Sequence, residues 1–157
     1  MKRSRILNKY LNVAIASLGH GDYIVISDAG FPIAREEQRV DLAIEADKPG
    51  IIEILDLVMS DLIYEECIVA QEQKNYNPEH YKRVCECSQR CEVSTMSHAE
   101  LLKYSHEAKY IIRTGGFEPW GNVVLCSGVD APVWFQKEGV KTPDYYENRV
   151  DFEEEKK

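Results

Sequence analysis

Apolar residues recur along this chain in two patterns, one helical and one typical of strands. Residues 23–27 (YIVIS) form a short run rich in β-branched side chains, which predicts a buried strand. The preceding segment predicts a helix over about residues 8–18, in which Asn8 can cap the start and Gly19 supplies a left-handed stop. Its apolar positions follow helical spacing: Leu7, Leu11, Ala14, Ile15 and Leu18.

The two patterns continue to about residue 126. Pro78 suits the first position of a helix, and Ser97 with Glu100 has the spacing of a capping box. Strands and helices therefore alternate, which predicts the α/β class with a largely parallel central sheet. The further elements that we expect are strands at 40–44, 67–70, 91–95, 110–112 and 122–126, and helices at 51–62, 78–89 and 98–107.

The pattern changes after Gly128. Residues 130–157 carry aromatic side chains that need a surface to pack on, and they either cover the domain or reach a neighbouring subunit. The charged end, 153–157, is expected to be disordered. We therefore divide the chain into a domain at 1–129 and a C-terminal extension at 130–157.

Composition excludes several classes of partner. The chain has 157 residues, the size of one ordinary domain, and a formal net charge of −8, which argues against nucleic acid and against an anionic membrane surface. No stretch approaches the roughly 20 apolar residues of a membrane span. The five cysteines are odd in number and three lie in one short segment, which favours reduced thiols and a cytoplasmic location.

The first candidate for chemistry is the turn Gly19-His20-Gly21-Asp22. Its glycines allow a ligand to approach the backbone, and the strand that follows ends at Asp28, where ligands of such sheets collect. Because His20 and Asp28 lie at opposite ends of one strand, a shared site would need a second subunit or loop. The alternative is that His20 is a surface turn residue and Asp28 a turn cap.

Two later segments are also candidates. His98 opens the helix capped by Ser97, where the helix N-terminus disfavours a charged imidazole; it could equally be an exposed first-turn residue. Trp120 offers a flat apolar face suited to a sugar ring, and Asn122 offers a donor and an acceptor for hydroxyls. The alternative is a core tryptophan beside an asparagine that starts a strand.

The segment Cys85-x-Cys87-x3-Cys91 raises the possibility of a zinc site, with His80 or His98 as the fourth ligand. The spacing is poor, because zinc sites commonly carry paired C-x2-C, so we expect small thiols and no metal. The chain also lacks the glycine-rich phosphate-binding motifs and the G-x-S-x-G nucleophile motif.

Several segments, in the right order, resemble one known family. The run LNKYLNVAIASLGHGDYIVISDAGFPI (7–33) resembles the N-terminal signature of the D-ribose pyranase / L-fucose mutarotase (RbsD/FucU) family. RVDLAI (39–44), MSHAELLK (96–103) and RTGGFEPWGNVVLCSGV (113–129) resemble its later blocks. The resemblance spans about residues 5–129 and implies an RbsD-like, three-layer α/β/α fold.

The resemblance also implies a reaction, the interconversion of sugar ring forms without cofactor or metal. It assigns the acid/base role to His20 and sugar binding to Asp28, His98 and the motif Trp120-Gly121-Asn122. The family forms homo-oligomeric rings, commonly decamers of two pentamers, with sites between neighbouring subunits. A histidine suits this chemistry because it titrates near neutrality.

The choice of sugar stays open between two branches. LNKYL, RVDLAI and SHAELLK resemble the ribose pyranases, whereas GHGD and Trp-Gly-Asn, in place of Tyr-Ala-Asn, resemble the fucose mutarotases. We expect a D-ribose pyranase that converts β-pyranose to β-furanose. The alternatives are a mutarotase that exchanges α and β anomers of L-fucose or another monosaccharide, and a sugar-binding module without activity.

Overall fold

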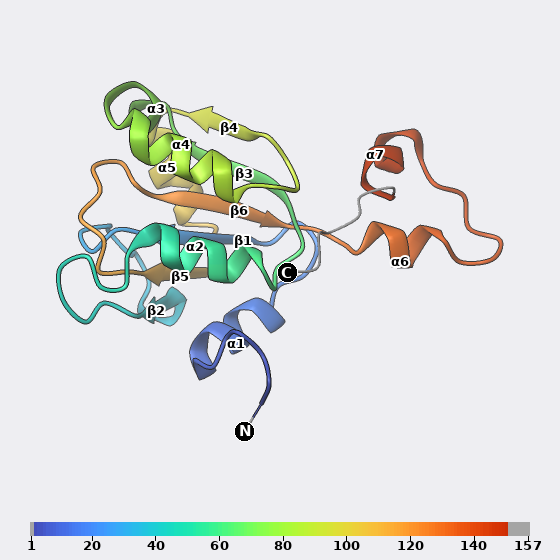
Figure 1. Cartoon of the computed structure of the whole chain (residues 1–157), viewed down its shortest axis with the longest axis horizontal. Coiled ribbons are helices and arrows are strands. Elements are labelled where there is room, and N and C mark those ends of the chain that lie inside the picture. The colour runs from blue at the N-terminus through green and yellow to red at the C-terminus, as the bar shows by residue number, and fades with distance from the viewer. Residues whose placement is uncertain (1, 151–157) are drawn as a thin grey trace.

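The computed structural model describes residues 2–150, which form three layers around one six-stranded sheet (Figure 1). The strand order is β2-β5-β1-β6-β3-β4, and only β6 runs antiparallel to its neighbours. The expected α/β class with a largely parallel sheet is therefore confirmed. The strands are β1 (Tyr23–Ser27), β2 (Arg39–Asp41), β3 (Tyr64–Ala70), β4 (Val93–Met96), β5 (Tyr110–Arg113) and β6 (Val123–Ser127).

Helices cover both faces of the sheet, because successive strand residues point to opposite sides. In β1, Ile24 and Ile26 pack with α1, α2 and α4, whereas Val25 packs on the other face with Leu101 of α5. The helices are α1 (Lys9–Ala16), α2 (Ile51–Met59), α3 (Gln71–Tyr76), α4 (Pro78–Cys87), α5 (His98–Ser105), α6 (Ala131–Phe135) and α7 (Glu147–Val150), with short 3-10 helices η1 (Glu36–Gln38) and η2 (Asp144–Tyr146). None of the helices in residues 2–150 is long and apolar enough to cross a membrane.

Local chemistry explains how the helices begin. The Asn8 side chain accepts hydrogen bonds from the amides of Tyr10 and Leu11, as predicted for a cap. Ser97 and Glu100 form the predicted capping box at the start of α5. Gly19 was predicted as the left-handed stop of α1, and this prediction is wrong: the helix ends at Ala16 with Ser17 as its C-cap, and in this turn Gly21 is the residue with positive φ, at 83°.

Several boundaries also differ from the predicted ones. The strand predicted at 40–44 ends at Asp41, because the Asp41 carboxylate accepts the amide of Ala43 and turns the chain. The helix α3 was not predicted, since its six residues are polar and carry no helical apolar pattern.

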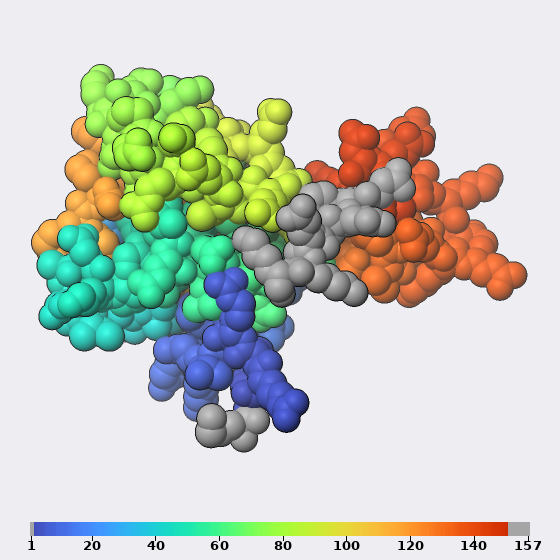
Figure 2. All heavy atoms as spheres, viewed as in Figure 1, coloured from blue at the N-terminus to red at the C-terminus, as the bar shows by residue number. Residues whose placement is uncertain are grey.

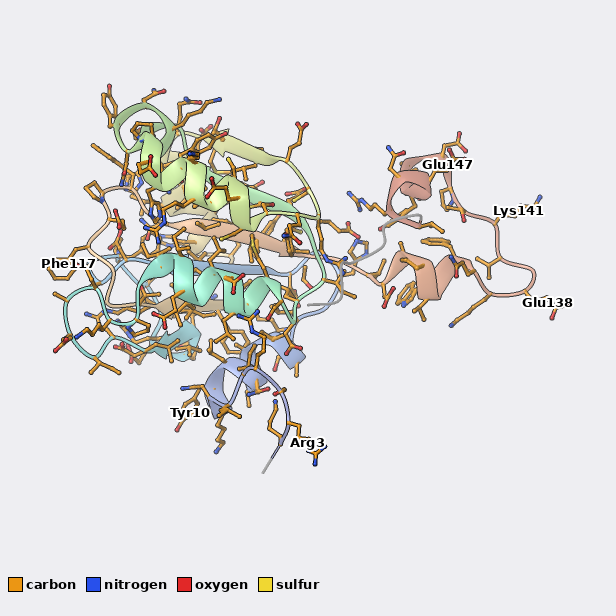
Figure 3. All side chains as sticks on the ribbon, in the orientation of Figure 1. Arg3, Tyr10, Phe117, Glu138, Lys141 and Glu147 are labelled. Atoms are coloured by element: carbon orange, nitrogen blue, oxygen red, sulfur yellow. The ribbon has the colours of Figure 1, made fainter. Side chains whose placement is uncertain are left out.

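The two ends of the sheet carry different segments. The loop with Phe117 lies at the carboxyl end of β1, while α6 and α7 lie at the opposite end (Figure 3). Residues 130–150 project from the domain there, as Figure 2 shows. Within them, the Tyr146 ring lies 5.0 Å from that of Phe135 and 5.2 Å from that of Tyr145. The disorder predicted for 153–157 lies outside the described residues.

Candidate functional site

A carboxylate and an amide face each other at the carboxyl end of β1. The side chain of the buried Asn122 donates to Asp28 Oδ2 at 2.9 Å, and its oxygen accepts the Asp28 amide at 2.9 Å. The amide of Gly30 donates to Asp28 Oδ1 at 2.8 Å. Because β6 is antiparallel to β1, its first residues meet the last residues of β1, and this topology brings two predicted site residues together.

Trp120 and Gly121 are held beside this pair by two buried side chains. The Gln73 amide donates to the Trp120 carbonyl at 2.7 Å, and His80 Nε2 donates to the Gly121 carbonyl at 3.2 Å. Trp120 has a φ of 53°, a region that costs a non-glycine residue free energy and so needs such support. Its ring is partly exposed and lies 5.4 Å from the ring of Tyr76.

His80 is almost fully buried, at 2% exposure, and burial lowers its pKa despite the Gly121 carbonyl and the Glu118 carboxylate, which favour the charged ring. The neutral ring that results donates through Nε2 only. His80 therefore positions the loop that carries Trp120.

His98 lies at the same end of the sheet, after β4. Its amide donates to Glu72 Oε2 at 2.9 Å, and its buried Nδ1 has no hydrogen-bond partner among the described residues. Strands lie about 4.8 Å apart, so three spacings put β4 roughly 14 Å from β1. His98 thus shares an edge with Asp28 but stands apart from it.

His20 lies at the other end of β1. Its Nε2 is 3.3 Å from Glu65 Oε2 at the start of β3 and 3.3 Å from the hydroxyl of Tyr146. The imidazole is 51% exposed. The five residues of β1 span roughly 16 Å at 3.3 Å per residue, so His20 and Asp28 of one chain do not form one site.

The Glu65 carboxylate beside His20 is well supplied with partners. Burial raises its pKa, but the Val129 amide at 3.3 Å and the Arg149 guanidinium at 2.5 Å outweigh that effect, and its pKa is lowered. Glu65 is therefore an anion at neutral pH. It lies directly against the imidazole of His20.

The cysteine segment does not form a metal site in the part of the chain described here, 2–150, where no group of three or more His, Cys, Asp or Glu side chains is placed to hold an ion. None of the five cysteines forms a disulfide within residues 2–150. Burial raises the pKa of the Cys67 and Cys91 thiols, which makes them poor nucleophiles.

Sequence reasoning missed five residues that support the predicted ones: Glu65, Gln73, His80, Tyr146 and Arg149. They contact the site from elements distant in sequence. Only the unexplained aromatic content of 130–157 was a signal that this segment needed a partner.

Known proteins resemble this chain over most of its length. The model of the RbsD / FucU transport protein family matches residues 1–130. D-ribose pyranase 1 of Streptomyces griseus is 43% identical over 151 residues, which cover 96% of this chain and 100% of that protein. D-ribose pyranase 2 of Rubrobacter xylanophilus is 45% identical over 151 residues, with 96% and 98% covered.

A solved structure agrees with these sequence matches. The structure of Bacillus subtilis RbsD complexed with D-ribose matches with a TM-score of 0.78 at 35% identity, and the match covers 82% of this chain and 98% of that one. Fold and sequence thus lead to one assignment: the chain belongs to the RbsD/FucU family.

Proposed function

We propose that this protein is a D-ribose pyranase that interconverts the β-pyranose and β-furanose forms of D-ribose, with His20 as the acid/base. Two relatives at 43% and 45% identity carry the name D-ribose pyranase, and the solved RbsD relative holds D-ribose. The single observation that carries the mechanism is the half-exposed imidazole of His20 against the Glu65 carboxylate.

The polar groups at the other end of the sheet suit a sugar. Asp28 and Asn122 form a fixed carboxylate and amide pair for hydroxyl groups, and His98, at the same edge, has a buried Nδ1 without a hydrogen-bond partner among residues 2–150. Trp120 offers a partly exposed ring face to the C–H face of a sugar. Gly121 has no side chain, so a ligand can approach the backbone closely beside the Trp120 ring.

Ring opening needs one proton delivered to the ring oxygen and one removed from the anomeric hydroxyl. The bond between C1 and the ring oxygen breaks, C1 becomes an aldehyde, and the C4 hydroxyl then attacks C1 to close the furanose. The same proton movements occur in reverse at closure, so one imidazole, which can both give and take a proton, serves both steps. These steps move only protons and exchange one C–O bond for another, so they need no electron transfer.

We propose that neighbouring subunits share each site, in a ring-shaped homo-oligomer that is a decamer of two pentamers. The roughly 16 Å between the ends of β1 separates His20 from Asp28 within one chain, and the exposed His20 can reach a neighbour. The five cysteines, none of which forms a disulfide in the described part of the chain, favour the reducing cytoplasm as the location.

Saturation-difference NMR on D-ribose at equilibrium tests the function. The wild-type protein should transfer saturation between pyranose and furanose signals, and His20→Ala should abolish this transfer. Exchange that persists undiminished in His20→Ala would refute the role of His20. Exchange confined to the anomers of L-fucose would favour the mutarotase, and line broadening without exchange would favour a binding module.

Mixing two variants tests the shared site. His20→Ala and Asp28→Ala should each be inactive alone, but co-refolded subunits should recover about a quarter of the wild-type rate, since half the subunits supply each intact residue. Recovery would fail if both residues had to come from one chain.

A further inference from the structure

The C-terminal extension contacts the His20 end of the sheet through Tyr146 and Arg149. Tyr146 in η2 is 8% exposed, and its hydroxyl lies 3.3 Å from His20 Nε2 and 3.4 Å from Glu65 Oε1. Arg149 in α7 pairs with Glu65 Oε2, and its guanidinium lies 5.1 Å from the centre of the Tyr146 ring. Two residues of the extension therefore surround the carboxylate that contacts His20.

These contacts assign the protons. The Tyr146 hydroxyl donates to Glu65 Oε1, so its oxygen is free to accept a hydrogen bond. His20 Nε2 then faces two acceptors, Glu65 Oε2 and the Tyr146 oxygen, and the neutral imidazole must carry its proton on Nε2. The lone pair is left on Nδ1 of a side chain that is half exposed.

We propose that Glu65, Tyr146 and Arg149 are positioning residues for His20, which fix its tautomer and leave Nδ1 as the nitrogen that exchanges protons with the sugar. The inference rests on the proposed function for the identity of the substrate. In such an arrangement the carboxylate sets the orientation of the histidine ring and stabilises the imidazolium that forms during proton transfer.

The charges around the imidazole support this arrangement. Arg149 and the Val129 amide keep Glu65 ionised, although burial opposes the charge. The other charged side chains at this turn, Asp22 and Lys109, form an ion pair with each other at 2.8 Å. Glu65 is therefore the anion that acts on His20, and Arg149 moderates its effect.

The extension lies beyond residue 130, where the match to the family model ends. The two pyranases that align over 151 residues extend into this region, whereas the match to the RbsD structure covers 82% of the chain. In this chain, therefore, the residues that support His20 come from a segment outside the part that the family model matches.

Kinetics of three variants test the proposal, with Tyr145→Phe as the control because Tyr145 is 78% exposed. Glu65→Gln and Tyr146→Phe should lower the maximal rate of ring exchange roughly tenfold and several-fold, respectively, with little change in KM. Arg149→Met should change mainly the pH dependence of the rate, because it removes a positive charge beside Glu65. Tyr145→Phe should match the wild type.

The pH profile separates positioning from general destabilisation. Loss of the Glu65 anion disfavours the imidazolium, so the acid limb of the rate profile should move to lower pH by about 0.5 unit or more in Glu65→Gln. Loss of the Arg149 cation should move it in the opposite direction. A merely structural role would not produce opposed shifts.

Nitrogen-15 NMR of the histidine rings gives an independent readout. The wild-type protein should show His20 protonated on Nε2, and Tyr146→Phe should mix the tautomers. Wild-type rates and profiles in both Tyr146→Phe and Arg149→Met, with His20→Ala inactive, would overturn the inference and leave the proposed function intact. A wild-type protein without ring exchange would overturn the function instead, while a proton found on Nδ1 would overturn the inference alone.

Discussion

Replacing Gly121 by Ala tests whether the loop beside Asp28 requires a residue without a side chain. A Cβ at this position would lie 2.7 Å from both Glu118 Cβ and Ile51 Cδ1, and 2.9 Å from the Glu118 carbonyl oxygen. The end of Ile51 can move, but the Glu118 carbonyl is backbone and accepts the Gly121 amide at 2.9 Å. The loop itself must therefore shift.

The magnitude follows from the cost of overpacking, about 1–3 kcal/mol in a close-packed site. At about 3 °C per kcal/mol for a chain of this size, the melting temperature should fall by roughly 3 to 9 °C. The shift displaces Trp120 and Asn122 on either side, so the KM for D-ribose should rise roughly tenfold.

Thermal unfolding at fixed protein concentration and ring-exchange NMR measure the two effects. Gly50→Ala is the matched control, because the nearest atom to a Cβ there lies at 3.8 Å and its φ of −76° suits alanine. It should change stability by about 0.5 kcal/mol or less. An unchanged melting temperature and KM in Gly121→Ala would refute the reasoning.

Two further measurements test the environment of buried groups. Burial lowers the pKa of His80, so the unfolded chain binds more protons below about pH 6.5 and the free energy of unfolding should fall from pH 7 to pH 5. Urea unfolding should show a smaller fall in His80→Gln, and equal falls would contradict this assignment. Burial also raises the pKa of the Cys67 and Cys91 thiols, and raises that of Cys126 to about 11. A chromogenic thiol reagent at neutral pH should therefore react slowly with these three cysteines in the native protein and rapidly with all five in denaturant. Rapid reaction of all five thiols in the native protein would contradict this expectation.

The regular elements could be predicted because their signals are local. Asn8, Pro78 and the Ser97–Glu100 pair act within one helical turn, and runs such as YIVIS contain their own strand preference. Gly19 was misassigned because two glycines flank His20, and the sequence does not say which one adopts positive φ. The direction of β6 was also open, because a short apolar run pairs equally well in either direction.

The site was predictable only in part, because its residues meet through pairings that no local pattern encodes. Asp28 and Asn122 are 94 positions apart and meet because β6 runs against β1. Nothing in the sequence around His80 indicated that its ring would hold the Gly121 carbonyl from a separate helix. The motif resemblance supplied the members of the site, while the sheet topology supplied their neighbours.

The two ends of β1 differ in what surrounds them, and this difference explains why an extension could be added at one of them. At the Asp28 end, Asn122 pairs with Asp28, and Gln73 of α3 holds the Trp120 carbonyl. At the His20 end, the short turn at 19–22 leads into β1, and β6 leaves the sheet. A chain that continues past Val129 must therefore start beside Glu65, within reach of His20. Adding residues at this end places new side chains near the proposed acid/base without disturbing the groups proposed to bind sugar.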